Sequence, residues 1–249
     1  MIVSTDGIVL RQQKISGGRR IIHIFTKEYG LISVGTNINE KTKKKSALGV
    51  RPFTYARYEL FKNKGYYNLN NLEVKKSYYA IGEDLDKYIS GSYVLEYLFK
   101  VLEEEQANIK IFNLTLDFFN VLAVGKSNSL TLPLAFVVKS FAMLGVMPEL
   151  NSCVRCGKEP EDILFSVKDG GVVCASCCEN DDQDTLIFKT NFDIVRLLKY
   201  FIKNPLKNFI KVQLKPEVYD ELRKIINKYI EYYLGVSGIL SDKLIDTDH

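Results

Sequence analysis

The sequence predicts an α+β protein, with an N-terminal barrel of five strands followed by a larger helical domain that carries a four-cysteine insert. Short apolar runs broken by turn residues fill residues 1–80. After Gly82, apolar residues recur every three or four positions, as they do in helices. Four cysteines form two C-x2-C pairs within residues 150–180. We therefore expect one domain over residues 1–80 and a second over residues 81–249, with the insert inside the second.

The expected strands lie between segments rich in glycine, asparagine and lysine, which favour turns or positive φ. They are residues 2–11, 20–26, 31–35, 53–62 and 66–75. Five strands in a small, charged domain indicate an oligonucleotide-binding barrel, the OB-fold, although an SH3-like barrel has nearly the same periodicity. In the fourth strand, one alternating set of side chains must fill the barrel, and the pattern does not distinguish between the two sets.

The expected helices have apolar residues at a spacing of three or four. They cover residues 85–102, 109–124, 130–144, 192–202 and 216–234. Pro216 suits the first turn of the last helix, and Gly235 suits its end.

Positive charge is concentrated at the start of the chain. Residues 1–80 hold fifteen Lys and Arg against five Asp and Glu, whereas residues 81–249 hold nineteen against twenty-five. A small domain with this excess is typical of proteins that bind polyanions such as nucleic acid, although a solvated lysine-rich surface is the alternative. The candidate DNA-binding residues lie in a basic turn beside two glycines and in a long lysine loop between the third and fourth expected strands: Arg19, Arg20, Lys41, Lys43, Lys44, Lys45 and Arg51.

The cysteine pairs are Cys153-Val-Arg-Cys156 and Cys174-Ala-Ser-Cys177, separated by seventeen residues. This spacing predicts one tetrahedral zinc ion held by four thiolates, with an iron–sulfur cluster or redox dithiols as the alternatives. Four thiolates leave no open position for a reacting water, so the zinc is expected to be structural. Cys178 is interpreted as a spare thiol.

Catalysis is not expected. The chain has two histidines, neither beside a catalytic partner, and it has no phosphate-binding P-loop, H-E-x-x-H or G-x-S-x-G motif. The longest apolar stretch falls short of the about 20 residues that a membrane span needs, and the start of the chain is unlike a secretory signal. We expect a cytoplasmic protein.

Several segments together resemble the bacterial RecO family of recombination mediators. These are Gly7-Ile-Val-Leu10, Phe25-Thr-Lys-Glu-Tyr-Gly-Leu31, Leu144-Gly-Val-Met-Pro-Glu-Leu150 running into Cys153-Val-Arg-Cys-Gly157, and residues 165–177 with Asp169-Gly-Gly171. The likeness covers nearly the whole chain, although residues 37–40 and the segment after Leu234 depart from the family pattern.

The resemblance implies a nucleoid-associated DNA repair protein that binds single- and double-stranded DNA and anneals complementary strands. It also implies a complex with RecR, binding of the acidic C-terminal tail of single-stranded DNA-binding protein, and, through these, loading of RecA. Lys139, a charge within the apolar helix 130–144, is the candidate contact for that tail. Two other readings stay open: an enzyme acting on nucleic acid, and a zinc-ribbon factor that binds RNA or polymerase.

Overall fold

The computed structural model describes residues 1–15, 19–38, 45–125, 130–160, 162–179, 185–189 and 193–239, with only the backbone of Lys45. The chain divides into two compact units. The first contains Met1–Asn128 and Ile239, and the second is Ser129–Gly238. We describe each unit by itself.

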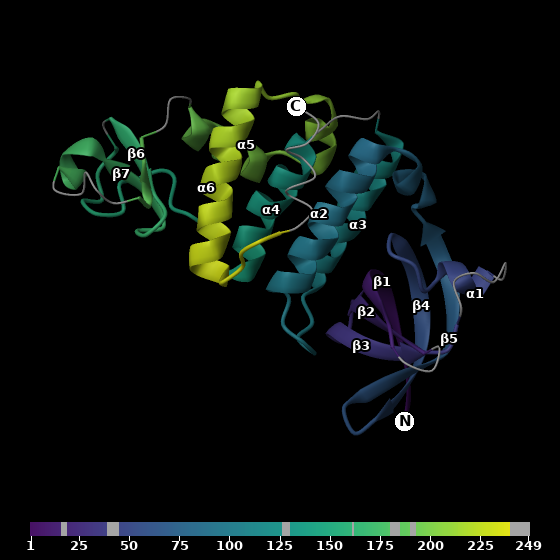
Figure 1. Cartoon of the computed structure of the whole chain (residues 1–249). Helices are drawn as coiled ribbons and strands as arrows, with labels where there is room; N and C mark the ends of the chain where they lie inside the picture. Colours follow the sequence, from purple (N-terminus) through teal and green to yellow (C-terminus); the bar gives the residue numbers. More distant parts are fainter. Residues whose placement is uncertain are drawn as a thin grey trace. The chain divides into compact units, whose positions relative to one another are not determined.

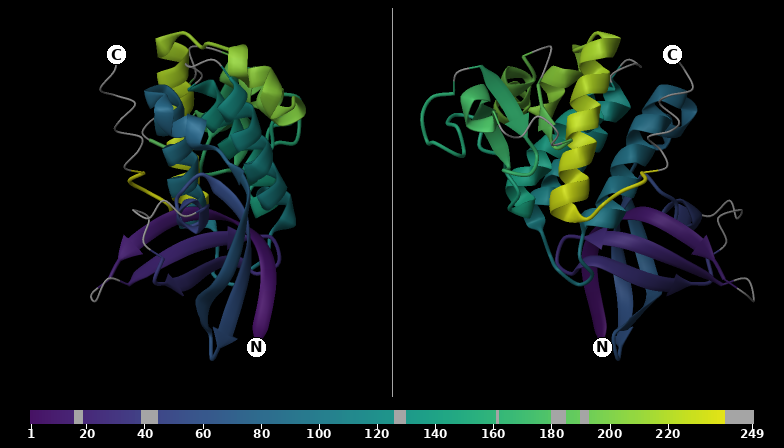
Figure 2. Two further views of the ribbon diagram at one scale, coloured as in Figure 1. Left: turned by 90° about the vertical axis from the view of Figure 1, so that its right-hand side faces the viewer. Right: turned by 60° about the vertical axis from the view of Figure 1, so that its left-hand side comes forward.

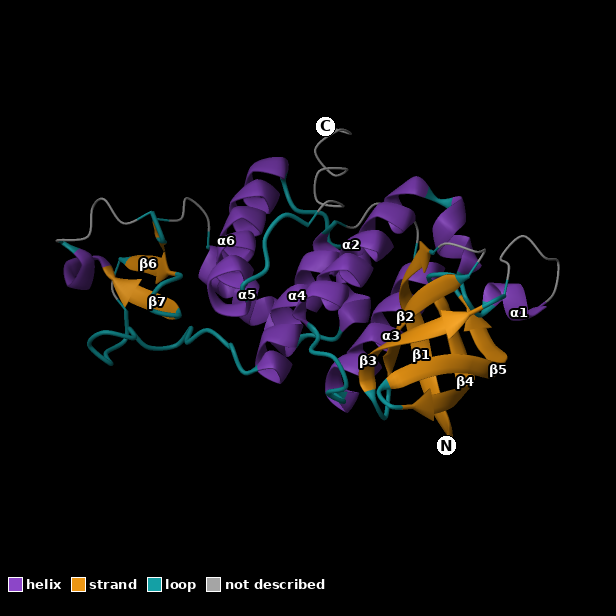
Figure 3. Cartoon of the chain, turned by 60° about the horizontal axis from the view of Figure 1, so that its bottom comes forward, coloured by secondary structure: helices purple, strands orange, loops and turns teal. Residues whose placement is uncertain are grey.

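Five strands close a barrel in the first unit (Figures 1 and 3). They are β1 (Ile2–Lys14), β2 (Arg20–Thr26), β3 (Gly30–Thr36), β4 (Thr54–Asn63) and β5 (Tyr66–Ser77). The order around the barrel is β1-β2-β3-β5-β4, and β4 returns to pair with β1. β3 and β5 pair in parallel, and the other neighbours are antiparallel. This topology confirms the OB-fold among the two barrels that the periodicity allowed.

The barrel interior takes one alternating set of side chains from each strand. In β4 the buried set is Thr54, Ala56, Tyr58 and Leu60, which resolves the choice between its two faces. They join a core of aliphatic side chains that includes Ile24, which is 0 % exposed. The Tyr58 hydroxyl donates to the carbonyl of Gly49 at 2.7 Å, so the buried polar atom is satisfied.

Two helices of the first unit pack on the barrel through aromatic side chains. They are α2 (Leu85–Val101) and α3 (Ile109–Val124), which follow the short helices α1 (Lys45–Leu48) and η2 (Tyr79–Glu83). Side-chain caps from Asp84 and Asn108 start them. Phe25 of β2 meets Phe112 of α3 edge to face, with ring centroids 5.4 Å apart. α2 and α3 belong to the same compact unit as the barrel. The domain boundary expected after residue 80 stays a prediction.

The second unit combines helices with a small sheet. The helices are α4 (Thr131–Leu144), η3 (Ala175–Cys178), α5 (Ile194–Lys203), η4 (Leu206–Lys211) and α6 (Pro216–Leu234). The strands are β6 (Ile163–Ser166), β7 (Gly171–Cys174) and β8 (Ile187–Phe188), in the order β7-β6-β8. Pro216 starts α6 and Gly235 ends it at φ 63°, as the sequence predicts.

The interior of the second unit forms around α4, most of whose side chains are buried. α6 (yellow in Figure 2) packs on it through Tyr229 and Phe141, whose ring centroids lie 5.1 Å apart. Across the described ranges, no helix is both long enough and apolar enough to cross a membrane.

Candidate metal centre and nucleic-acid interface

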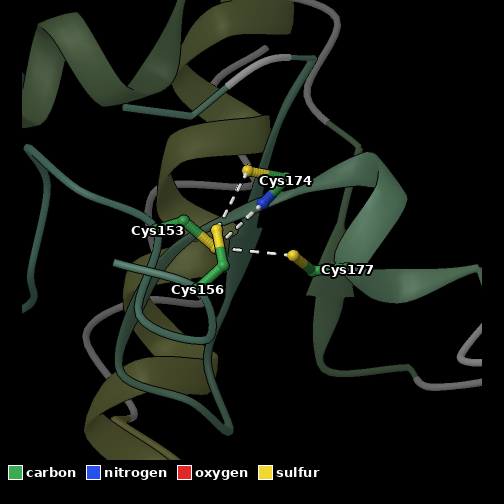
Figure 4. Close-up of side chains that lie close together, drawn as sticks. All are labelled: Cys153, Cys156, Cys174 and Cys177. Carbon is green, nitrogen blue, oxygen red and sulfur yellow. Dashed lines mark hydrogen bonds between the residues drawn. The ribbon is translucent and has the colours of Figure 1, made fainter. Parts of the chain in front are cut away.

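The two cysteine pairs converge on one point in the second unit (Figure 4). Cys153 and Cys156 lie in the turn that follows α4, Cys174 ends β7 and Cys177 lies in η3. All four sulfur atoms are within 4.8 Å of one another, and Cys153–Cys177 and Cys156–Cys174 are 4.0 and 3.9 Å apart. Four sulfurs bound to one zinc at 2.3 Å would be about 3.8 Å apart. The cluster can therefore hold a tetrahedral metal ion with little movement.

Backbone N–H groups around Cys153 favour its thiolate. Burial alone would raise the pKa of Cys153, but N–H groups of Cys156, Cys174 and Arg155 lower it to about 6. The N–H of Cys174 donates to this sulfur at 3.4 Å. Gly157, at φ 73°, closes the first turn by donating its N–H to the carbonyl of Cys153. The turn geometry thus prepares a sulfur ligand.

Crowding by the other sulfurs acts in the opposite direction on Cys177. Hydrogen bonding with the Cys156 thiol, together with burial and the neighbouring Cys153, raises the pKa of Cys177 to about 12. Four thiolates cannot share this space without a compensating cation. A divalent ion supplies that charge, which is why the donor set suits zinc.

Arg155 ties the two cysteine loops together. Its guanidinium donates to the carbonyl of Cys177 at 2.8 Å and pairs with Asp169 at 2.7 Å. Asp169 also accepts from the Ser166 hydroxyl, at 2.6 Å. Burial would raise the pKa of Asp169, but Arg155 and Ser166 together hold it below its usual range. A residue between the first two ligands therefore positions the loop that carries the fourth.

Cys178 lies outside the four-sulfur group of the described residues. It is 6 % exposed and packs with Cys153, Val173 and Cys174 in the small core of this sheet. Its side chain is therefore an apolar packing element here.

On the barrel, a cleft of about 520 Å³ opens beside β2, β3 and the start of β5. Arg19 and Arg20, both predicted to bind DNA, line it together with Tyr66 and Asn68. Arg19 is exposed, whereas Arg20 is only 7 % exposed and donates to the Gln12 side chain at 3.1 Å. Tyr66 is 75 % exposed. A cleft lined by both cations and an exposed ring is the combination that single-strand binders use.

The sequence analysis did not single out Tyr66 or Asn68. They reach the cleft because β3 and β5 pair at Val34–Tyr67 and Gly35–Asn68, a contact between distant segments. A local signal exists in retrospect, since two tyrosines directly follow the Asn63-Lys-Gly turn. At Gly35 a Cβ atom would lie 2.9 Å from the Asn68 side chain, so glycine allows this close approach.

The predicted lysine loop is only partly described. Lys41, Lys43 and Lys44 lie outside the described residues, and Lys45 begins α1 with its side chain undescribed. Arg51 follows α1 in a turn and is half-buried. Whether these five residues contact DNA stays a prediction.

Two other cations of the barrel are engaged by an acid. Asp6 pairs with Lys75 at 2.8 Å and with Arg57 at 3.2 Å. The Tyr55 hydroxyl also donates to it. Asp6 therefore neutralises part of the charge on this side of β1 and β4.

Lys139 projects from α4 within the second unit and is half-buried. Its ammonium donates to the carbonyl of Ile202, near the end of α5, at 3.0 Å. This bond links α4 to α5. A role in peptide binding stays a prediction.

Family models and individual related proteins match this chain over nearly its whole length, and all of them point to the same family. The N-terminal family model, "Recombination protein O N terminal", matches residues 1–78, and the C-terminal model, "Recombination protein O C terminal", matches residues 82–242. The DNA repair protein RecO of Alkaliphilus metalliredigens is 31 % identical over 235 residues, which are 94 % of this chain and 94 % of that protein. That of Bacillus subtilis is 31 % identical over 95 % of this chain and 91 % of its own length. That of Caldanaerobacter subterraneus is 29 % identical, covering 93 % of each.

Proposed function

Because this chain belongs to the RecO family of DNA repair and recombination proteins, we propose that it binds single- and double-stranded DNA and anneals complementary single strands. The observation that carries this proposal is the basic OB barrel with its cleft, which both Arg19 and the exposed ring of Tyr66 line. Cations screen the repulsion between two strands, and base pairing supplies the specificity, so the protein needs no readout of sequence.

The proposal extends to partners that act in the same pathway. We infer that the chain works with RecR and binds the acidic tail of single-stranded DNA-binding protein, so that RecA can load on coated strands in the cytoplasm, at the nucleoid. Lys139 is our candidate contact for the tail.

In this proposal, the protein breaks no covalent bond and its metal is one structural zinc. Four cysteines offer four thiolates, which fill a tetrahedral shell and leave no place for a reacting water. The zinc would hold the β6–β7–β8 sheet in place.

The decisive experiment is annealing of complementary oligonucleotides without nucleotide cofactor, at low and high salt. We expect acceleration at low salt that falls steeply as salt rises. If annealing at low salt is no faster than without protein, the proposal fails. Stronger binding to structured RNA than to single-stranded DNA would favour the RNA-binding alternative instead.

Substitutions in the first unit, followed by measurement of DNA affinity, test where DNA binds on the barrel. Tyr66→Ala should cost about 1–3 kcal/mol of binding, since one stacking surface is lost. Tyr79→Ala is the matched control, because Tyr79 is a tyrosine of the same unit that is 62 % exposed. Replacing Lys43, Lys44 and Lys45 with Ala should weaken binding equally on all sequences and reduce the salt slope, and an unchanged slope would mean that they do not touch phosphate.

A further inference from the structure

A second concentration of positive charge lies in the other unit. Residues 194–216 hold six basic residues and no acidic one: Arg196, Lys199, Lys203, Lys207, Lys211 and Lys215. The rest of residues 129–238 holds eight basic and fourteen acidic residues. We call these six residues the α5–η4 cationic surface. Its charge is opposite to that of the unit around it.

A rigid base presents this surface. α5 and η4 bury their apolar residues, among them Phe201 and Phe209, whose ring centroids are 5.0 Å apart. Both elements contact α4 (Figure 1). The Thr131 hydroxyl donates to the carbonyl of Val212 at 2.8 Å and so holds the chain just after η4. The backbone that carries the lysines is therefore held by packing against α4.

Four of the six cationic groups are exposed and lack an acidic partner among the described residues. Lys203, Lys207, Lys211 and Lys215 are exposed, and within the described ranges none of them forms an ion pair. Arg196, by contrast, pairs with Asp193 at 3.1 Å. Four unpaired like charges along about 13 residues repel one another, and a polyanion removes that repulsion.

An aromatic ring lies within the same surface. Tyr200, between Lys199 and Lys203 in α5, is 41 % exposed. Its ring meets Phe209 of η4 at 90°, with centroids 5.5 Å apart, so its orientation is fixed by packing. A fixed aromatic ring among cations can stack on an unpaired base.

We propose that the α5–η4 cationic surface binds the backbone of a second nucleic-acid strand, in addition to the strand that the barrel binds. This inference rests on the proposed annealing function and extends it. Lys199 and Lys203 lie one turn apart on the same face of α5, about 6 Å apart along the helix axis. Phosphates repeat about every 3.4 Å along a helical strand, so this pair spans about two phosphates. One cationic surface in each unit allows one chain to hold both strands to be annealed, which raises their effective concentration.

The number of cations, six without an acid between them in the sequence, favours a nucleic acid over an acidic peptide. A polyanion with repeating charge can use every member of the series, whereas binding of a short acidic tail depends on an apolar pocket beside one or two cations. Exposed polar residues among the lysines include Asn208 and Gln213. These suit phosphate and sugar contacts.

The test compares two triple variants with the same loss of charge, both in the full chain. One is Lys203→Ala, Lys207→Ala, Lys211→Ala. The control is Lys158→Ala, Lys168→Ala, Lys228→Ala, three exposed lysines elsewhere in the second unit. We would measure annealing rates and the number of oligothymidylate strands bound per chain. Metal content and thermal unfolding check that both variants fold.

We expect the first variant to keep one bound strand and to lose the second. Three lost phosphate contacts should lower the salt slope of the second binding step by about 2 and weaken that step by about 50-fold near physiological salt. Annealing should slow accordingly. The Lys→Arg version of the same triple should behave like the wild type, since it keeps the charges.

The outcomes separate this inference from the function on which it rests. If the wild type anneals and both triple variants match it, the second site does not exist and the proposed function stands. If the wild type binds DNA but never anneals, the proposed function fails, and strand number still tests the surface. If the first triple loses binding of an oligoaspartate peptide but keeps both strands, the surface docks a protein and the inference is wrong.

Discussion

The barrel contains five strands of seven to thirteen residues around a closed interior, whereas the four-cysteine sheet contains three strands of two to four residues. The barrel core consists of aliphatic and aromatic side chains. The core of the small sheet consists of Val173 and three cysteines, two of which are metal-ligand candidates. The barrel can therefore fold through burial of apolar surface, and the small sheet cannot, because its own core is so limited.

The barrel and the four-cysteine sheet depend on different forces, so the stability of each can be changed without changing that of the other. Hydrogen exchange measured segment by segment distinguishes them, since it reports protection separately for the barrel strands and for residues 150–180.

The largest expected effect is removal of the metal. Cys153→Ser with Cys174→Ser should abolish binding of one zinc per chain and remove protection from β6 and β7, while the barrel stays protected, because structural zinc contributes about 10–16 kcal/mol to such sites. Metal analysis and hydrogen exchange measure this. Cys178→Ala is the control and should keep the metal, since Cys178 lies outside the four-sulfur group. A double variant with full metal content would refute the assignment.

The next prediction concerns a substitution in the barrel core, which should leave the metal site intact. Ile24→Ala should destabilise it by about 2–5 kcal/mol through a cavity, and Ile24→Val by about 0.5–1.5 kcal/mol. Ile24 fills the space above Gly7, where a Cβ atom would lie 2.5 Å from its side chain. Denaturant unfolding gives the magnitude, and metal analysis should show zinc retained. Loss of zinc along with the barrel would mean that the two regions are coupled.

A smaller effect, on metal affinity, is expected from replacing Arg155, which links the two cysteine loops. Arg155→Ala removes the donor to Cys177 and the partner of Asp169, so metal affinity should fall about 10–100-fold, as for other residues that position metal ligands. Competition with a chromophoric chelator measures the affinity. Lys158→Ala, an exposed position in the same loop, should leave it unchanged. Equal losses in both variants would show that charge alone matters.

The smallest effect depends on pH and belongs to the barrel. Burial would raise the pKa of Asp6, but hydrogen bonds from Lys75 and Tyr55 and the charge of Arg57 hold it below 3.8. The carboxylate therefore stabilises the folded state above its unfolded pKa, and this contribution is lost as pH falls below about 4 through the folded pKa. Unfolding curves of the wild type should show this loss, and Asp6→Asn should reduce it. An identical pH dependence in both would exclude Asp6 as its source.

The long helices and strands were predictable because turn-forming and helix-ending residues next to them mark where they begin and end. The strand over residues 20–26 and the helices over 109–124 and 216–234 have the ends that the sequence predicts. The strands β6, β7 and β8 were not predicted, because two to four residues show no periodicity. The convergence of the four cysteines beside this sheet is what the C-x2-C spacing does predict.

The candidate binding surfaces were predictable only in part. The sequence analysis named Arg19 as a candidate DNA contact, and Arg19 lines the cleft, whereas Tyr66 lines it through barrel closure, which involves residues far apart in sequence. The α5–η4 cationic surface was missed for a different reason. The net charge of residues 81–249 is negative, so that total conceals these six basic residues. Counting charge over shorter segments is needed to detect them.

Barrel closure has a consequence for how the molecule fluctuates. In the described strands, β3 joins β5 at two residue pairs, whereas β4 and β5 pair along nearly their full lengths. The barrel should therefore open first between β3 and β5, where the fewest backbone pairs hold two neighbouring strands together. An oligonucleotide bound along the cleft would contact both strands, so local opening of the barrel should be rarer in the bound state than in the free state.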